Sequence, residues 1–158
     1  MVARKLAENR LVICATPAYL KANGTPQTPQ ELAHHSCLIY SYATAPLEWR
    51  FVGPDGRRRK VRVAGRFVSN NGGAMRAVLL GGGGIIAAPE FLVGRDVREG
   101  RLRPILTEYS WGGSSGVYAV YPQNRFVSTK VRAFIAHLVA AFGPIAPWNA
   151  TEEPSSKP

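Results

Sequence analysis

Serine and histidine side chains are the first residues of this sequence that could perform chemistry. Segment 112–116 has the spacing GxSxG, which in some hydrolases holds a nucleophilic serine, here Ser114, at a strained turn. Such a turn needs a strand before it and a helix after it, whereas the apolar run VYAVY that follows predicts a strand. The histidines, His34, His35 and His137, supply no evident acid and base pair for the serine. We therefore expect no hydrolase site.

Phosphate-loop and metal chemistry fit the sequence no better. The four glycines at 81–84 are not followed by GK[ST], and they come after a predicted helix, whereas a phosphate loop precedes one. The two cysteines, Cys14 and Cys37, and the three histidines lack the spacing of a zinc site, and the acidic residues form no evident catalytic pair. We expect no enzymatic activity, no cofactor and no metal.

Binding of a small anion is better matched to the sequence. Thr16 follows the apolar run LVICA and precedes Pro17. Asn70, with Asn71 beside it as a second possible cap, follows the run FVS and precedes the helical pattern of 74–80. Each residue therefore stands where a strand ends and a helix begins, and helix N-termini present free amides with a partial positive charge. Both residues could equally be ordinary helix caps that bind nothing.

The net charge of +10 raises a second possibility, which is binding to nucleic acid. Seven of the 20 basic residues lie between positions 50 and 66, around the turn signal GPDG. A solvated hairpin tip explains this concentration without any partner. Salt-dependent binding of DNA, lost when Arg57, Arg58 and Arg59 are neutralised, would support the nucleic-acid alternative.

Alternation of predicted strands and helices indicates an α/β domain with a largely parallel sheet. Strands are predicted at 11–15, 37–40, on both sides of the GPDG turn, at 67–69, 85–88 and 117–121, and helices at 18–23, 74–80 and 129–142. The last helix has one apolar stripe, formed by Val131, Phe134, Ile135, Leu138, Val139 and Phe142. Because neither a signal peptide nor a membrane-spanning run is evident, we expect a cytoplasmic protein that does not bind membranes.

The same segments, taken in order, resemble a known family, the C-terminal substrate-binding region of LysR-type transcription regulators. The resemblance is carried by five pieces that cover residues 1 to about 143: LVICATPAYLKANGTPQTPQELAHHSCLIY, WRFVGPDG, FVSNNGGAMRAVLLGGGGIIAAPEFLV, GRLRPIL and VYAVYPQNRFVSTKVRAFIAHLV.

The resemblance implies an α/β fold like that of type 2 periplasmic binding proteins, mostly one of its two subdomains with part of the other. Residues 1–12 would be a remnant of subdomain one with the first crossover strand, and 13–117 the effector-binding subdomain two. Residues 118–143 would form the second crossover and the helix that returns to subdomain one, and 144–158 a disordered tail.

The resemblance also implies a function, which is sensing of a small organic effector by a homo-oligomeric regulator. Effector contacts carried over by position fall on Thr16, Val68, Ser69, Asn70 and Tyr118. The effector is expected to be an anion, and DNA would be bound only through the winged helix-turn-helix domain that is not part of this sequence. A solute-binding protein of a transport system, with the same fold, is the alternative. Because subdomain one is incomplete here, we expect the apolar stripe of the last helix to be partly exposed.

Overall fold

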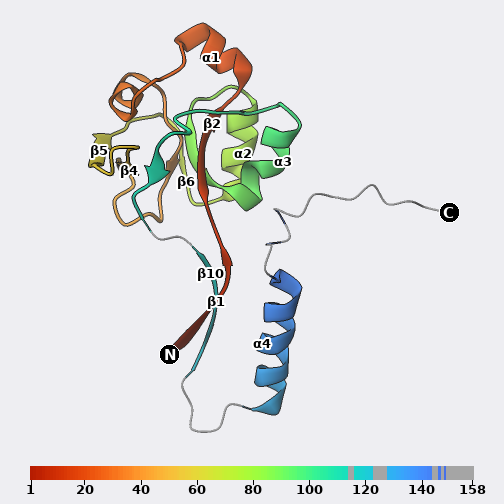
Figure 1. Cartoon of the computed structure of the whole chain (residues 1–158). Helices are drawn as coiled ribbons and strands as arrows, with labels where there is room; N and C mark the ends of the chain where they lie inside the picture. The colour runs from red at the N-terminus through yellow and green to blue at the C-terminus, as the bar shows by residue number, and fades with distance from the viewer. Residues whose placement is uncertain (114–115, 123–127, 144–145, 147, 149–158) are drawn as a thin grey trace, which may run out of the picture. The chain divides into compact units, whose positions relative to one another are not determined.

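The computed structural model describes residues 1–113, 116–122, 128–143, 146 and 148, and it divides the chain into two compact units (Figure 1). Unit 1 consists of Met1–Arg10 and Ser115–Pro158, and unit 2 of Leu11–Ser114. Within the described residues, none of the helices combines the length and the apolar character that a membrane crossing requires. The two units are described separately.

Unit 1 is built from an antiparallel strand pair and one helix. Strand β1 (Val2–Glu8) pairs with β10 (Gly116–Tyr121), and α4 (Thr129–Phe142) follows, capped by the hydroxyl of Ser128, which accepts a hydrogen bond from the Val131 amide. The predicted final helix is thus confirmed. Its stripe is only partly covered, because Ile135 is buried whereas Phe134 is 61% exposed. The predicted tail, 144–158, lies outside the described residues apart from positions 146 and 148.

A mixed central sheet organises unit 2. Strand β2 (Leu11–Ala15) lies between β7 (Ile86–Pro89) and β8 (Arg103–Pro104) and is antiparallel to both. Strand β3 (Ile39–Tyr40) runs parallel to β6 (Val68–Ser69) and joins β7 through a parallel bridge between Cys37 and Ile85. The expectation of a largely parallel sheet was wrong, because strand direction depends on which strands become neighbours, and the neighbours of β2 come from much later in the chain.

Side chains of this sheet alternate between two faces, and each face has its own core. On β2, Ile13 and Ala15 belong to one cluster of buried residues and Cys14 to the other. Helices α2 (Gly72–Leu80) and α3 (Glu90–Arg98) cover the Cys14 face through residues such as Leu79 and Val93. This layering follows from the two-residue period of strands, which sends successive side chains to opposite faces.

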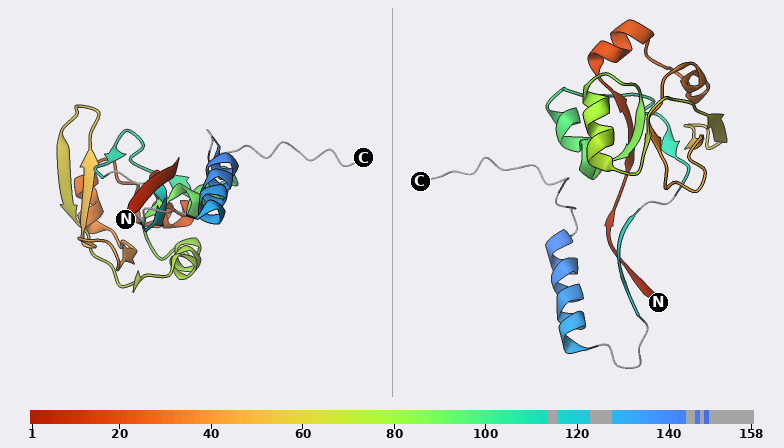
Figure 2. Two further views of the ribbon diagram at one scale, coloured as in Figure 1. Left: turned by 90° about the horizontal axis from the view of Figure 1, so that it is seen from below. Right: turned by 180° about the vertical axis from the view of Figure 1, so that it is seen from behind.

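The other face is covered by the predicted β-hairpin and by two short helical segments. Strands β4 (Glu48–Val52) and β5 (Arg58–Arg62) pair antiparallel around the GPDG turn, and β9 (Ser110–Trp111) extends the small sheet. Helix α1 (Pro17–Asn23) and the 3-10 helix η1 (Pro29–His34) complete this side. Within unit 2, the hairpin and the pair α2 and α3 therefore lie on opposite sides of the central sheet (Figure 2).

Candidate functional site

The carboxyl ends of three parallel strands meet at one edge of the unit 2 sheet. Strands β3, β6 and β7 run in the same direction. Their last residues, which are Tyr40, Ser69 and Pro89, therefore lie at the same edge of the sheet. Helix α2 starts at Gly72, shortly after the end of β6 at Ser69, and α3 starts directly after β7. Ligands of open α/β sheets bind at such an edge, where helix N-termini point outward. We call this edge the β6–α2 edge, defined by residues 68–73 together with Tyr40 and Tyr42.

The cap of α2 is Asn71, the second of the two adjacent asparagines that were predicted as caps, and Asn70 does not cap the helix. The Asn71 side-chain oxygen accepts a hydrogen bond from the Ala74 amide at 2.9 Å, and the Ser69 hydroxyl oxygen accepts one from the Asn71 amide at 3.0 Å. The helix also begins at Gly72, earlier than the apolar pattern indicated. Two glycines at its start carry no apolar side chain, so periodicity could not include them.

Free donors remain at this helix start. In the part of the chain that the structure describes, the amides of Gly72 and Gly73 donate no hydrogen bond. The Asn71 side-chain oxygen accepts from the Ala74 amide, and the Asn71 carbonyl oxygen accepts from the Met75 amide. Neither glycine has a side chain that could cover its amide. The Ser69 hydroxyl uses an oxygen lone pair towards Asn71, which leaves its proton free to donate outward. These three donors suit an anionic oxygen.

Tyr40, which was not among the predicted contacts, lies next to Ser69, and a second tyrosine, Tyr42, contacts Tyr40. Tyr40 is the register partner of Ser69 in the parallel pair of β3 and β6, and it is 43% exposed. Its ring meets the ring of Tyr42 edge to face, with 6.2 Å between centroids, and Tyr42 is 74% exposed. Large exposed aromatic rings next to free polar donors are typical of a ligand site. The only sequence signal was the position of Tyr40 at the end of a predicted strand.

Of the predicted contacts, Val68, Ser69 and Asn70 lie together at the β6–α2 edge, and Thr16 does not. Val68 is 56% exposed and Asn70 is exposed. Thr16 is only 7% exposed, and its hydroxyl caps α1 by accepting from the Tyr19 amide at 3.2 Å. A methyl group at Gly82, beyond the C-terminal end of α2, would lie 3.7 Å from the Thr16 hydroxyl. Thr16 is therefore near the opposite end of α2, and a helix of nine residues is about 13 Å long.

The remaining predicted contact, Tyr118, belongs to unit 1. It lies on β10, is paired with Lys5 of β1 and is 45% exposed.

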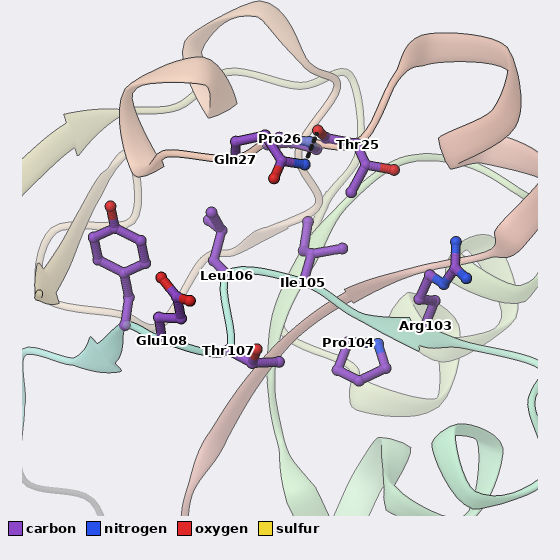
Figure 3. Close-up of a pocket in the computed structure, with 10 residues that line it drawn as sticks. Thr25, Pro26, Gln27, Arg103, Pro104, Ile105, Leu106, Thr107 and Glu108 are labelled. Carbon is purple, nitrogen blue, oxygen red and sulfur yellow. Dashed lines mark hydrogen bonds between the residues drawn. The ribbon is translucent and has the colours of Figure 1, made fainter. Parts of the chain in front are cut away.

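A separate pocket of about 320 Å³ opens in unit 2 between the loop after α1 and the segment that follows β8 (Figure 3). Its buried members, Pro26, Ile105 and Leu106, are apolar. Its charged members, Arg103 and Glu108, are exposed to solvent, and the Gln27 side-chain amide donates a hydrogen bond to the Thr25 carbonyl oxygen at 3.0 Å (Figure 3). Selective ligand binding depends on a few fixed polar groups, and neither of the two charged side chains that line this pocket is buried. It contains none of the predicted contacts.

A buried ion pair holds α2 in place. The Asp96 carboxylate of α3 is fully buried and accepts two hydrogen bonds from Arg76 of α2, at 2.6 and 2.7 Å. Arg101 donates to the same carboxylate at 2.8 Å. Hydrogen bonds from Arg76 lower the pKa of Asp96, burial opposes that shift, and Arg101 adds to it. Asp96 therefore links the helix that starts at the β6–α2 edge to its neighbour.

The other titratable groups provide no catalytic arrangement among the described residues. Burial raises the pKa of the Cys14 thiol to about 12 and that of Cys37 to about 12, so both thiols stay protonated. Within the described ranges, no three His, Cys, Asp or Glu side chains gather closely enough to hold a metal ion. Ser114 of the GxSxG segment lies outside those ranges.

Comparison with known proteins gives consistent matches. The family model described as LysR substrate binding domain matches residues 1–143. The regulator CrgA of Neisseria meningitidis is 33% identical over 141 residues, which are 89% of this chain and 46% of that protein. PtxR of Pseudomonas aeruginosa is 34% identical over 136 residues, which are 86% of this chain and 43% of that protein. Both are described as HTH-type transcriptional regulators, and the chain spans about half of their length.

Solved structures agree with these matches. The CrgA regulatory domain superimposes with a TM-score of 0.75 at 32% identity, covering 90% of this chain and 69% of that domain. The full-length virulence activator AphB of Vibrio cholerae gives a TM-score of 0.77 at 25% identity, with 89% of this chain and 47% of AphB covered. The expected fold, like that of type 2 periplasmic binding proteins, is thereby confirmed. The chain belongs to the LysR substrate binding domain family, the effector-binding domain of LysR-type transcription regulators.

Proposed function

We propose that this chain binds a small organic anion at the β6–α2 edge and serves as the effector sensor of a transcription regulator. The observation that carries the proposal is the set of three unused donors, which are the amides of Gly72 and Gly73 and the Ser69 hydroxyl. A helix N-terminus adds a partial positive charge equivalent to about half an elementary charge. A carboxylate is the simplest group that satisfies all three donors, and Tyr40 and Tyr42 can pack on its organic part.

The contacts in this proposal differ from those that the resemblance implied. Val68, Ser69 and Asn70 remain in the proposed site, and the two glycines and two tyrosines are added. Thr16 acts instead as the cap of α1, because it is buried and lies near the other end of α2. Tyr118 stays a proposed contact on unit 1.

In the complete regulator, effector binding would shift the population of conformations and so change how DNA is held. We propose a homo-oligomer that binds DNA through an N-terminal helix-turn-helix domain, acts in the cytoplasm and catalyses no reaction. The relatives named above are transcription regulators, which favours this function over a transport protein.

Thermal unfolding in the presence of small carboxylates tests the proposed site. A ligand at about 100 times its dissociation constant stabilises a protein by about 2.7 kcal/mol. Gly73→Asp would place a carboxylate at the start of α2, where this carboxylate can accept hydrogen bonds from the free amides. We therefore expect the substitution to abolish the stabilisation by ligand without unfolding the chain. The neutral amides of the same carboxylic acids should stabilise the chain much less than the acids do.

Thr16→Ala is the matched control for this experiment. Loss of the α1 cap should lower stability by about 1 kcal/mol, and the increment from the carboxylate should remain. The site would be disproved if Gly73→Asp kept the ligand response, or if Thr16→Ala lost it. Equal stabilisation by acids and amides would disprove the anionic character of the effector.

A further inference from the structure

The outward face of the β4–β5 hairpin carries a concentration of positive charge. Three cross-strand pairs lie on this face: Glu48 with Arg62, Arg50 with Lys60, and Val52 with Arg58. Of the intervening residues, Trp49, Phe51 and Val61 are buried in the core of unit 2, and Arg59 lies over the ring of Tyr109. Because strand side chains alternate, the hairpin buries one face and presents the other to solvent. We call this outward face the basic hairpin face, formed by Glu48, Arg50, Val52, Arg58, Lys60 and Arg62.

Carboxylates neutralise only part of this face. Glu48 contacts Arg50 at 2.8 Å and Lys60 at 3.4 Å. Arg58 and Arg62 are exposed and form no ion pair among the described residues. Four cations against one carboxylate leave a surplus of three positive charges. The arginines of the turn contribute less, because Arg57 and Arg59 share Asp55.

Spacing and composition narrow the class of partner. Alternate residues on a strand lie about 6.7 Å apart and neighbouring strands about 4.8 Å apart, so the cations form a compact array. Val52 is the only apolar side chain of the face, whereas protein interfaces need an apolar core and aromatic anchors. The face also has no aromatic ring on which the bases of a single strand could stack. A closely spaced row of phosphates requires neither feature.

We propose that the basic hairpin face binds the phosphate backbone of duplex DNA without sequence preference. The inference rests on the proposed function, because a regulator held on DNA by another domain presents this face to the same duplex at high effective concentration. The hairpin lies on the opposite side of the unit 2 sheet from α2 and α3 (Figure 1). DNA contact and occupation of the β6–α2 edge therefore involve different residues.

Fluorescence anisotropy with a short labelled duplex and the 158-residue chain tests the proposal. Neutralising three phosphates predicts that affinity falls about 40-fold between roughly 50 and 200 mM salt. Arg58→Ala combined with Arg62→Ala removes the two unpaired cations, and this fall should shrink to about 3-fold. Arg4→Ala combined with Arg132→Ala removes the same charge from exposed sites of unit 1 and should leave the 40-fold fall unchanged.

Lysine acetylation footprinting on the wild-type chain tests the same proposal without relying on variants that could fail to fold. Duplex DNA should protect Lys60 from acetylation and leave the exposed Lys21 reactive. Equal losses of affinity in both double variants, or equal protection of both lysines, would overturn the proposal. So would the absence of any binding at low salt, or tighter binding to anionic lipid vesicles than to DNA. Failure of the carboxylate experiment would not alter these readouts, so the two proposals can fail independently.

Discussion

The ion pair between α2 and α3 makes a quantitative prediction. Asp96→Asn keeps the size of the side chain but removes the charge that Arg76 and Arg101 share. Replacing a carboxylate oxygen by an amide NH2 group also makes this group, a hydrogen-bond donor, face the N–H donors of the arginines, because a guanidinium has no acceptor. The substitution should therefore loosen α2, the helix whose first residues belong to the β6–α2 edge.

The size of the effect follows from burial. Breaking a fully buried ion pair typically costs about 3 to 5 kcal/mol. Asp96 is fully buried, but the side chains of Arg76 and Arg101 are 38% and 46% exposed, so both can be rehydrated when their partner is lost. We therefore expect a loss of about 2 to 3 kcal/mol, which is just below that range. For a chain of this size the melting temperature should fall by about 4 to 12 °C.

Urea unfolding followed by tryptophan fluorescence measures this loss, since Trp49 and Trp111 both belong to unit 2. Glu99→Gln is the matched control, because Glu99 is an exposed carboxylate that contacts Arg95 and Arg101. Exposed pairs contribute about 0 to 1 kcal/mol, so the control should change stability little. Equal destabilisation by the two substitutions would refute the argument from burial.

The same ion pair predicts a pH dependence with a definite sign. Because the pKa of Asp96 is lower in the folded state than its ordinary value of 3.8, ionised Asp96 stabilises the fold at neutral pH. That contribution should decline as the pH falls below about 3.8 towards the folded-state pKa. The stability difference between the wild type and Asp96→Asn should narrow over this interval. A difference that stays constant from neutral pH to pH 3 would contradict the assignment.

Three further predictions follow from the packing. Cys14 and Cys37 should resist alkylation in the folded chain at neutral pH, because burial raises both pKa values to about 12; rapid labelling seen by mass spectrometry would contradict this. Gly84→Ala should cost at least about 2 kcal/mol in urea unfolding, since φ is +145° and the new methyl group would lie 2.2 Å from the Ser36 carbonyl oxygen. Phe134→Ser should reduce binding of an apolar dye without lowering the melting temperature, because this ring is 61% exposed; unchanged dye fluorescence would count against the exposed stripe.

Local patterns were sufficient to predict most elements of the fold. The run LVICA followed by Thr16 and Pro17 predicted β2, the cap and α1, because capping and fixed proline geometry act within a few residues. The GPDG turn predicted the hairpin for the same reason. The glycines at the start of α2 hid its true first turn, so the sequence left both Asn70 and Asn71 open as the cap, and the structure shows that Asn71 is the cap.

Strand direction and the composition of the site depended on contacts between distant segments. The pairing of β2 with β7 and β8, and of Tyr40 with Ser69, joins segments far apart in the chain, and no local propensity encodes such a pairing. Thr16 and Asn70 looked alike in sequence because each follows a strand, yet the two lie near opposite ends of α2.

The amino-acid sequence alone was enough to assign the family, the α/β class and the places where a helix follows a strand, since these depend on short-range order and on an ordered set of motifs. Tertiary structure decided which helix starts share an edge, which cations remain unpaired and which carboxylate is buried. Those properties arise when the sheet assembles and brings distant backbone and charged groups together, and a one-dimensional pattern does not contain that information.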